Sequence, residues 1–417
     1  MSAMMRKGDK NLVVGLDVGT SKVAALVGEV GEDGRVNLIG HGAHPTRGGL
    51  RRGMVVDIDS TANAIGRAVE AADLMSNCQI NSVWVGIAGA HISSQDSQGV
   101  TGVQGSEITR DDVRRVIESA RAIAVPDGQR ILHAVAQEYS IDGQDGIREP
   151  VGMSGVRLEA KVHIVTGAVS AMQNISKCVD RCGLGVEGIV LAPLAASHAV
   201  LNEDEKALGV CVVDIGSGTS DLAIYVDGAL RHTHVLPIAG DQITNDIAVG
   251  LKTPTRYAES IKINHGSLIF QDDKEADIAI EVPSVSDRPP RRMSREILLR
   301  IVRPRVEEIL QYVRDEIRRV GFEEQINAGI VLTGGTAKLP GLVEIAEEMF
   351  HMPVRVGTAQ GVGGITSVVS DPENATGIGL ILHGVQSMQS RFEPPRETIG
   401  GMQTVLQRIK RWFADHI

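Results

Sequence analysis

At 417 residues the chain is too long for one compact core, so two or more domains are expected. It contains 47 glycines, above the usual ~7% of residues, which indicates tight turns and places where the backbone approaches a ligand. The formal net charge of −10 argues against a protein that binds nucleic acid by neutralising phosphates. Aromatic residues, at 3%, are too scarce for base stacking.

The cysteine pattern and the N-terminal residues indicate in which cellular compartment the protein is expected. The cysteine spacing matches no zinc motif, so we expect buried thiols in a reducing cytosol rather than metal or redox chemistry. Residues 1–11 lack the apolar segment of a signal peptide, and no stretch reaches the ~18 uninterrupted apolar residues of a spanning helix. Any membrane contact is therefore expected to be peripheral. The cysteines are Cys78, Cys178, Cys182 and Cys211.

The chain begins with a strand–turn–strand unit. Residues 12–18, LVVGLDV, form an apolar, β-rich run that ends in a small-residue turn, and further strands are expected at 23–30 and near 36–40. The same pattern recurs at 210–216, VCVVDIG, where an apolar run again ends in Asp, an apolar residue and Gly. This recurrence indicates an internal duplication, and hence two similar lobes.

A small α+β block is expected to interrupt the first half of the chain. Its helix is expected at 109–124, with Thr109 as the N-cap and acidic residues in the first turn. The flanking strand-like runs are 83–88, 131–141 and 157–165.

The second half ends in helices and a linker. The polar stretch at 271–296 is expected to form exposed loops, and 297–320 a long helix that Pro304 should kink or interrupt. The Pro- and Gly-containing segment 390–401 is typical of a linker, and 402–417 is expected to form a separate helix.

The two small-residue turns have the chemistry of a phosphate site. A strand that ends in Asp and runs into a glycine-rich turn presents several backbone N–H groups in a concave nest that binds phosphate oxygens. Hydroxyl groups add donors, and Lys22 adds a point charge. Asp17 and Asp214 are suited to hold a hydrated Mg²⁺ ion through water. The predicted phosphate contacts are Gly19, Thr20, Ser21, Lys22, Gly216, Ser217, Gly218 and Thr219.

One such turn alone is equally well explained as an ordinary hairpin. Two copies, each at the start of a half-chain, predict lobes that face each other and clamp one triphosphate with its metal. There is no GxxxxGK[ST] sequence, which excludes a P-loop protein. A third turn follows a strand at 329–333, and its residues Gly334, Gly335 and Thr336 leave room for the flat ring of an adenosine.

The order of these three elements resembles that of the actin, sugar-kinase and heat-shock ATPase superfamily. Within it the chain resembles the FtsA family of bacterial cell-division proteins, over residues 11–386 and the tail. The matching motifs are LDVGTSKV, VDIGSGTSDLAIY, GDQITNDIA at 240–248, AESIKI at 258–263 and LTGGTAKLPG. The resemblance implies an α/β, actin-like two-lobe ATPase fold with duplicated mixed-sheet cores, small inserted subdomains and a C-terminal amphipathic helix on a linker.

The resemblance also implies a domain plan and ligand contacts. Glu259 and Lys262 would lie near the adenosine, although their spacing also fits a solvated helix face. The first lobe core would comprise 1–83 and 164–206, and the second 207–239 and 305–389. A subdomain for self-association would lie at 84–163, and a subdomain that binds the C-terminal peptide of FtsZ at 240–304. The linker 390–401 and the membrane-targeting helix 402–417 would follow. A basic cluster could meet that peptide, but fits a solvated face equally well: Arg291, Arg292, Arg295, Arg300, Arg303 and Arg305.

Catalysis stays open at the level of sequence. Asp17, Asp214 and Asp221 are candidate general bases by residue type only, and no spacing selects one of them. The resemblance implies ATP and Mg²⁺ binding with slow or no hydrolysis, so that ATP acts as a conformational ligand.

The last residues, GGMQTVLQRIKRWFADHI, predict an amphipathic helix. Its large apolar side chains fall within an arc of about 120°, flanked by basic residues that can reach lipid phosphates. The pattern also fits a helix docked on its own domain or on a partner. The linker, the flanking charges and the resemblance favour anionic lipid on the cytoplasmic side of the inner membrane, at the division site. The predicted membrane contacts are Val405, Leu406, Arg408, Ile409, Lys410, Trp412 and Phe413.

Together these expectations describe an ATP-binding cell-division protein that self-associates into actin-like filaments and tethers the FtsZ ring to the cytoplasmic membrane. The alternatives are a small-molecule kinase on the same fold, which leaves the basic tail unexplained, and a pilus-assembly protein of the same superfamily. Contacts with other division proteins are possible.

Overall fold

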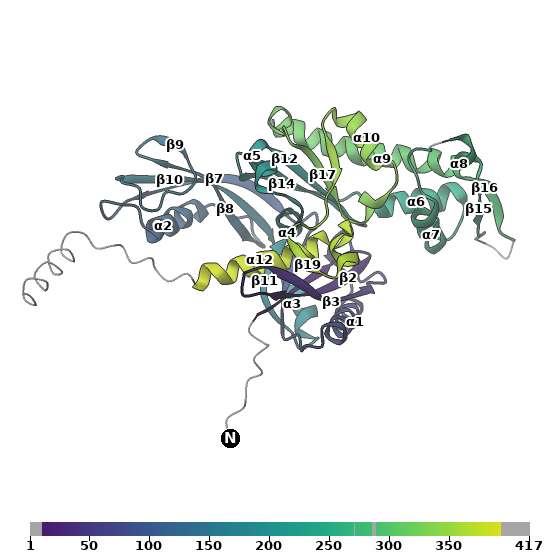
Figure 1. Cartoon of the computed structure of the whole chain (residues 1–417), viewed down its shortest axis with the longest axis horizontal. Coiled ribbons are helices and arrows are strands. Elements are labelled where there is room, and N and C mark those ends of the chain that lie inside the picture. Colours follow the sequence, from purple (N-terminus) through teal and green to yellow (C-terminus); the bar gives the residue numbers. More distant parts are fainter. Residues whose placement is uncertain (1–10, 271, 286–288, 393–417) are drawn as a thin grey trace, which may run out of the picture.

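The computed structural model describes residues 11–270, 272–285 and 289–392 (Figure 1). The predicted helix at 402–417, and nearly all of the predicted linker at 390–401, lie outside the described residues. Two mixed β-sheets form the centre of the molecule, and a third, smaller sheet extends from them. The mixed α/β fold class predicted from the sequence is confirmed.

The first sheet is built around the first hairpin. β1 pairs antiparallel with β2 and parallel with β6, and the strand order is β11-β6-β1-β2-β3-β19. Apolar side chains point to both faces of β1, so both faces are covered: α1 and α3 pack on one side, and α4 and α12 on the other. The elements are β1 (Leu12–Val18), β2 (Lys22–Val30), β3 (Val36–Pro45), β6 (Ser82–Ile87), β11 (Gly185–Leu191), β19 (Val362–Gly364), α1 (Ile58–Ser76), α3 (Val169–Asp180), α4 (Ala192–Val200) and α12 (Ala375–Phe392).

The second sheet repeats the first. Its order is β14-β13-β12-β17-β18, in which β12 pairs antiparallel with β13 and parallel with β17, as β1 does with β2 and β6. The duplication predicted from the two Asp-containing runs is therefore confirmed at the level of strand order. The elements are β12 (Val210–Ile215), β13 (Ser220–Val226), β14 (Ala229–Leu236), β17 (Gly329–Thr333) and β18 (Val354–Val356).

A four-stranded antiparallel sheet in the order β7-β10-β8-β9 interrupts the first lobe and packs against the helix α2 (Figure 1). The predicted cap is present: the Thr109 side chain accepts from the Asp112 backbone N–H, and the Asp112 carboxylate accepts from that of Thr109. β6 pairs within the first sheet, so the inserted sheet starts at β7. The elements are β7 (Ser93–Gly102), β8 (Gln129–Ile141), β9 (Gln144–Ile147), β10 (Arg157–Ala168) and α2 (Arg110–Arg121).

The second lobe carries its own insertion of helices and a small hairpin. The loops expected at 271–296 are partly wrong, because Ile280 and Val282 are buried and pin a hairpin onto the core. Pro304 lies inside α9 and does not end it, since Val302 and Val306 are buried on either side of it. The elements are α6 (Gly240–Leu251), α7 (Thr255–His265), α8 (Asp273–Asp277), β15 (Ala279–Val282), β16 (Arg291–Ser294), α9 (Arg295–Arg319) and α10 (Leu342–Phe350).

The helix α12 lies against the first sheet and α4, at very short range. A side chain on Gly379 would collide with the backbone carbonyl of Ala195 in α4, and one on Gly15 with the carbonyl of Gly377. The glycines thus let the backbones touch where the two lobes meet. Among the described residues, no helix is both long and apolar enough to cross a membrane.

Candidate functional site

A cavity of about 420 Å³ opens between the two duplicated sheets. Both hairpin turns, the turn after β17 and one face of α7 line it. Every residue that the sequence predicts to contact nucleotide or metal is among its lining: Asp17, Gly19, Thr20, Ser21, Lys22, Asp214, Gly216, Ser217, Gly218, Thr219, Glu259, Lys262, Gly334, Gly335 and Thr336.

The two turns have the same backbone geometry and face each other. The N–H of Gly19 donates to the carbonyl of Lys22 over 3.0 Å, and that of Gly216 to the carbonyl of Thr219 over 3.0 Å. A side chain at Gly218 would collide with the Thr20 hydroxyl, which accepts at 3.0 Å from the backbone of Gly53. The two turns therefore lie close together and line the same cavity.

Three carboxylates lie together below these turns. Burial, then repulsion from Asp214, raises the pKa of Asp17 from 3.8 to about 7. Burial likewise raises the pKa of Asp214, although Thr376 donates to it over 2.7 Å. The pKa of Asp221 is well above its ordinary value, first because of burial and then because Asp214 repels it. The three charges are thus poorly compensated within the described chain.

This arrangement fits a hydrated divalent cation. One carboxylate oxygen of Asp221, Oδ1, is buried without a hydrogen-bond partner within the described chain. Such an oxygen is costly to bury, and a cation or its water ligands would satisfy it. Mg²⁺ prefers carboxylate ligands and keeps several waters, so it suits a site with room between the carboxylates.

The turn after β17 is fixed onto the second hairpin. Gly334 has a φ of 85°, and a side chain there would collide with the Asp214 carboxylate, so only glycine fits. The Thr336 hydroxyl donates to the carbonyl of Gly216 over 3.0 Å. The turn that the sequence assigns to adenosine is therefore a direct neighbour of the second phosphate turn.

Helices α6 and α7 close the same side of the cavity. The ammonium of Lys262 donates to the Thr244 hydroxyl over 2.9 Å and pairs with Glu259 over 2.8 Å. Its side chain is only 14% exposed, which makes the solvated-face interpretation a poor fit for Lys262, whereas Glu259 is 41% exposed. The N-terminus of α6 contacts the second turn, because the Asp241 N–H donates to the carbonyl of Ser217.

Sequence reasoning missed an ion-pair chain that crosses the cavity. Lys22 of the first turn pairs with Glu373 over 2.7 Å, and Glu373 pairs with Lys338 over 3.0 Å. Burial raises the pKa of Glu373, but the hydrogen bonds from Lys22 and Lys338 outweigh it and lower that pKa. Thr376 and Gly53 were missed too. No local pattern marks Glu373, Thr376 or Gly53, because each reaches the site from a distant part of the chain, whereas Lys338 lies in the LTGGTAKLPG motif two residues after Thr336.

We predict that Asp17→Asn raises the melting temperature of the ligand-free protein more at pH 8 than at pH 5.5. The pKa of Asp17 is about 7 in the folded chain and 3.8 when unperturbed, so the folded form takes up a proton as pH falls through 7. The charge therefore lowers stability above pH 7, and protonation removes this cost as the pH falls. Asparagine never carries the charge.

Calorimetric melting curves at both pH values, without magnesium or nucleotide, measure this difference. The exposed Asp145→Asn is the matched control, because it makes the same chemical change away from the cavity. An Asp17→Asn effect that is the same at both pH values, or larger in acid, would contradict the account of the carboxylates.

Family models match two parts of the chain. The model described as cell division protein FtsA matches residues 211–379, and the SHS2 domain inserted in FtsA matches residues 89–166. Among solved structures, the PilM–PilN type IV pilus biogenesis complex covers 89% of this chain and 98% of its own, with a TM-score of 0.65 and 17% identity. ADP-bound MreB5 of Spiroplasma citri covers 92% of this chain and 99% of its own, with a TM-score of 0.58 and 14% identity. These two likenesses show the actin-like fold alone.

Curated relatives match along nearly the whole length. The cell division protein FtsA of Pseudomonas aeruginosa is 53% identical over 96% of this chain and 97% of its own. That of Escherichia coli K12 is 44% identical over 98% of this chain and 99% of its own. The chain belongs to the FtsA family of bacterial cell-division proteins.

Proposed function

We propose that the chain binds ATP with Mg²⁺ in the cavity between its two lobes. The observation that carries the proposal is the meeting of two equivalent glycine-and-aspartate turns on one cavity. The triphosphate would lie between the turns, with Lys22 released from Glu373 to a phosphate. Asp17 and Asp214 would hold the hydrated metal, and Gly334, Gly335 and Thr336 would flank the adenosine beside Glu259 and Lys262.

ATP would act by closing the cavity. Since the turns belong to different lobes, a ligand that touches both favours the closed arrangement. The ion-pair chain from Lys22 through Glu373 to Lys338 would have to rearrange when phosphate arrives, which couples the first turn to the adenosine turn. Hydrolysis would be slow or absent, since none of the three carboxylates is singled out as a general base.

We further propose that the protein self-associates into filaments and links FtsZ to the inner membrane at the division site. Membership of the FtsA family supports division-protein partners and sets aside the kinase and pilus alternatives. Self-association is assigned to the inserted subdomain at 84–163, and binding of the FtsZ C-terminal peptide to 240–304.

The basic cluster considered for that peptide is largely engaged by the chain itself. Arg300, Arg303 and Arg305 pair with acidic residues of their own lobe. Arg291 donates to the carbonyl of Leu251, and Arg295 donates to that of His265. The cluster therefore offers less free charge than its sequence indicates, and the peptide site remains a proposal for the subdomain as a whole.

Membrane attachment is assigned to 402–417, outside the described residues. Fully burying one large apolar side chain is worth ~1.5–3 kcal/mol, and burial at an interface is partial. Ordering a short helix opposes binding. A single tail would therefore hold the membrane reversibly, and several tails on one filament would hold it firmly through effective concentration. Assembly and attachment would reinforce each other.

Nucleotide binding is tested by calorimetric titration of Mg-ATP into the wild type, Asp214→Asn and Asp145→Asn. Asp214 is assigned to the metal through water, so its loss should weaken Mg-ATP binding by about 10–100-fold, the range for outer-shell partners of a metal. The exposed Asp145→Asn should bind like the wild type. Equal affinity in all three proteins, or no binding to the wild type, would overturn the nucleotide proposal.

Membrane attachment is tested by pelleting with liposomes that contain anionic lipid. The wild type should pellet, and a truncation after Gly401 should stay in the supernatant. Trp412→Glu should also fail to pellet, because it places a charge in the apolar stripe, whereas Trp412→Leu keeps the stripe apolar and should pellet. If all four proteins pellet equally, the helix is not the anchor.

A further inference from the structure

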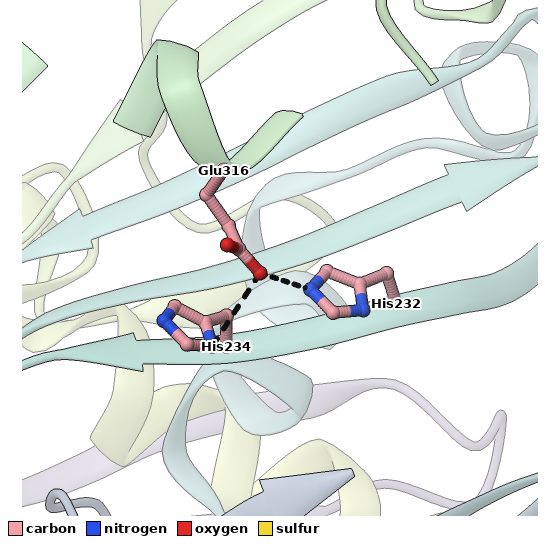
Figure 2. Close-up of side chains that lie close together, drawn as sticks. All are labelled: His232, His234 and Glu316. Carbon is pink, nitrogen blue, oxygen red and sulfur yellow. Dashed lines mark hydrogen bonds and ion pairs between the residues drawn. The ribbon is translucent and has the colours of Figure 1, made fainter. Parts of the chain in front are cut away.

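Three side chains with metal-binding groups converge between β14 and α9, away from the cavity (Figure 2). His232 and His234 are two residues apart on one strand, so their side chains leave the same face of the sheet. Glu316 reaches them from the facing helix α9. Sequence reasoning found no metal motif here, because the carboxylate lies far along the chain from the histidines.

The distances suit a single small ion. Oε1 of Glu316 lies 2.8 Å from Nε2 of His232 and 3.5 Å from Nδ1 of His234. All three ligand atoms lie within 4.8 Å of one another. Zinc binds nitrogen and oxygen ligands at ~2.0–2.2 Å, which places neighbouring ligand atoms roughly 3.3 Å apart in a tetrahedron. Small side-chain rotations would therefore bring the three atoms onto one ion.

The protonation states are also favourable. Burial lowers the pKa of both His232 and His234, which favours the neutral form of imidazole that metals bind. Burial raises the pKa of Glu316, but hydrogen bonds from Arg319 and His232 outweigh it and bring that pKa to about 2. Two neutral imidazoles and one carboxylate are a common ligand set for catalytic zinc.

Arg319 is the feature that opposes a cation. Its guanidinium donates to both carboxylate oxygens of Glu316 over 2.7 Å, and so competes for Oε1. The Arg319 side chain is 63% exposed, whereas Glu316 is 8% exposed, so the terminal nitrogen of the arginine can leave Oε1 while the carboxylate stays in place. If Nε of Arg319 keeps its hydrogen bond to Oε2, Arg319 would orient the carboxylate for the ion. Its positive charge would nevertheless repel the bound cation.

The cluster lies beside the joint between the second sheet and the inserted sheet. Thr233 lies between the two histidines, and its hydroxyl forms a 3.0 Å hydrogen bond with Nε2 of His163 in β10. The ring of His163 lies 6.3 Å from that of His232. The Ser94 hydroxyl of β7 donates to the carbonyl of Thr233. An ion at the cluster would therefore fix β14 to α9 next to the contacts that hold the inserted subdomain.

We propose that His232, His234 and Glu316 form a binding site for a Zn²⁺ ion, with a fourth position open to water or to a ligand from outside the chain. The site is separate from the nucleotide cavity, and it stands or falls independently of ATP binding. Ion occupancy would stiffen the joint between the second lobe and the inserted subdomain.

The test titrates Zn²⁺ into the untagged full-length protein, freed of metal by a chelator, in competition with a colorimetric zinc indicator. The wild type should bind one equivalent, and His234→Ala and Glu316→Gln should each weaken binding by at least about tenfold. Arg319→Ala should bind Zn²⁺ several-fold more tightly, because it frees Oε1 and removes a positive charge. A purely structural hydrogen-bond cluster gives no reason for that gain.

His44→Ala is the matched control. It removes a half-buried imidazole on strand β3, away from the cluster, and should leave Zn²⁺ binding unchanged. Circular dichroism of each variant checks folding. Zn²⁺ should also raise the melting temperature of the wild type but not of His234→Ala. Absence of saturable binding, binding that survives both ligand variants, or weaker binding to Arg319→Ala would each overturn the proposal.

Discussion

The repulsion between Asp17 and Asp214 is the constraint on which the rest of the structure depends. Each carboxylate is carried by the second-to-last residue of the central strand of a duplicated sheet, so the fold cannot separate them without separating the lobes. Burial and this repulsion together raise the pKa of Asp17 to about 7, and Asp221 adds a third poorly compensated carboxylate. Only protons, a cation or an opening of the cavity relieves the strain. The ligand-free protein therefore carries an electrostatic free-energy cost, which a metal-bound triphosphate would remove. For this reason the nucleotide would favour the closed arrangement of the lobes.

A shared apolar core joins the two lobes, because buried side chains of both sheets belong to one cluster around α4 and α12. Helices α4 and α12 lie between the sheets, and their backbones touch at Gly379 and Ala195. An ionic link, from Lys22 through Glu373 to Lys338, adds to this packing. Backbone contact of this kind resists compression but permits small rotations, whereas the ion pairs can exchange partners. A ligand in the cavity would thus change the ionic link and leave the packed one as the pivot.

The parts of the site that the sequence predicted are those with local patterns. The turns at Gly19 and Gly216, and the turn at Gly334, could be read because glycine, aspartate and hydroxyl residues follow apolar strands directly. Glu373 could not, because its role exists only once β1 and the end of the chain are brought together. Lys338 lies in the third motif, but its pairing with Glu373 could not be read from that motif. His232 and Glu316 could not be predicted as a site either, because only the folded chain brings them together. The long helix predicted at 297–320 is present as α9, and Pro304 does not interrupt it. The loops predicted over 279–282 and 291–294 are strands instead, because burial of two side chains decides them. The expected domain boundaries and the tail helix stay predictions, and the pairing of β6 in the first sheet favours a start of the insertion after Ile87.

The central claim is that one nucleotide contacts both duplicated turns at once. A crystal structure of the protein with Mg²⁺ and a non-hydrolysable ATP analogue tests it most directly. The account predicts phosphate oxygens on backbone N–H groups of both the Gly19–Lys22 and Gly216–Thr219 turns, the ion within one water of Asp17 and Asp214, and Lys22 parted from Glu373. An analogue that contacts only one turn, or that lies outside the cavity with the Lys22–Glu373 pair intact, would contradict it.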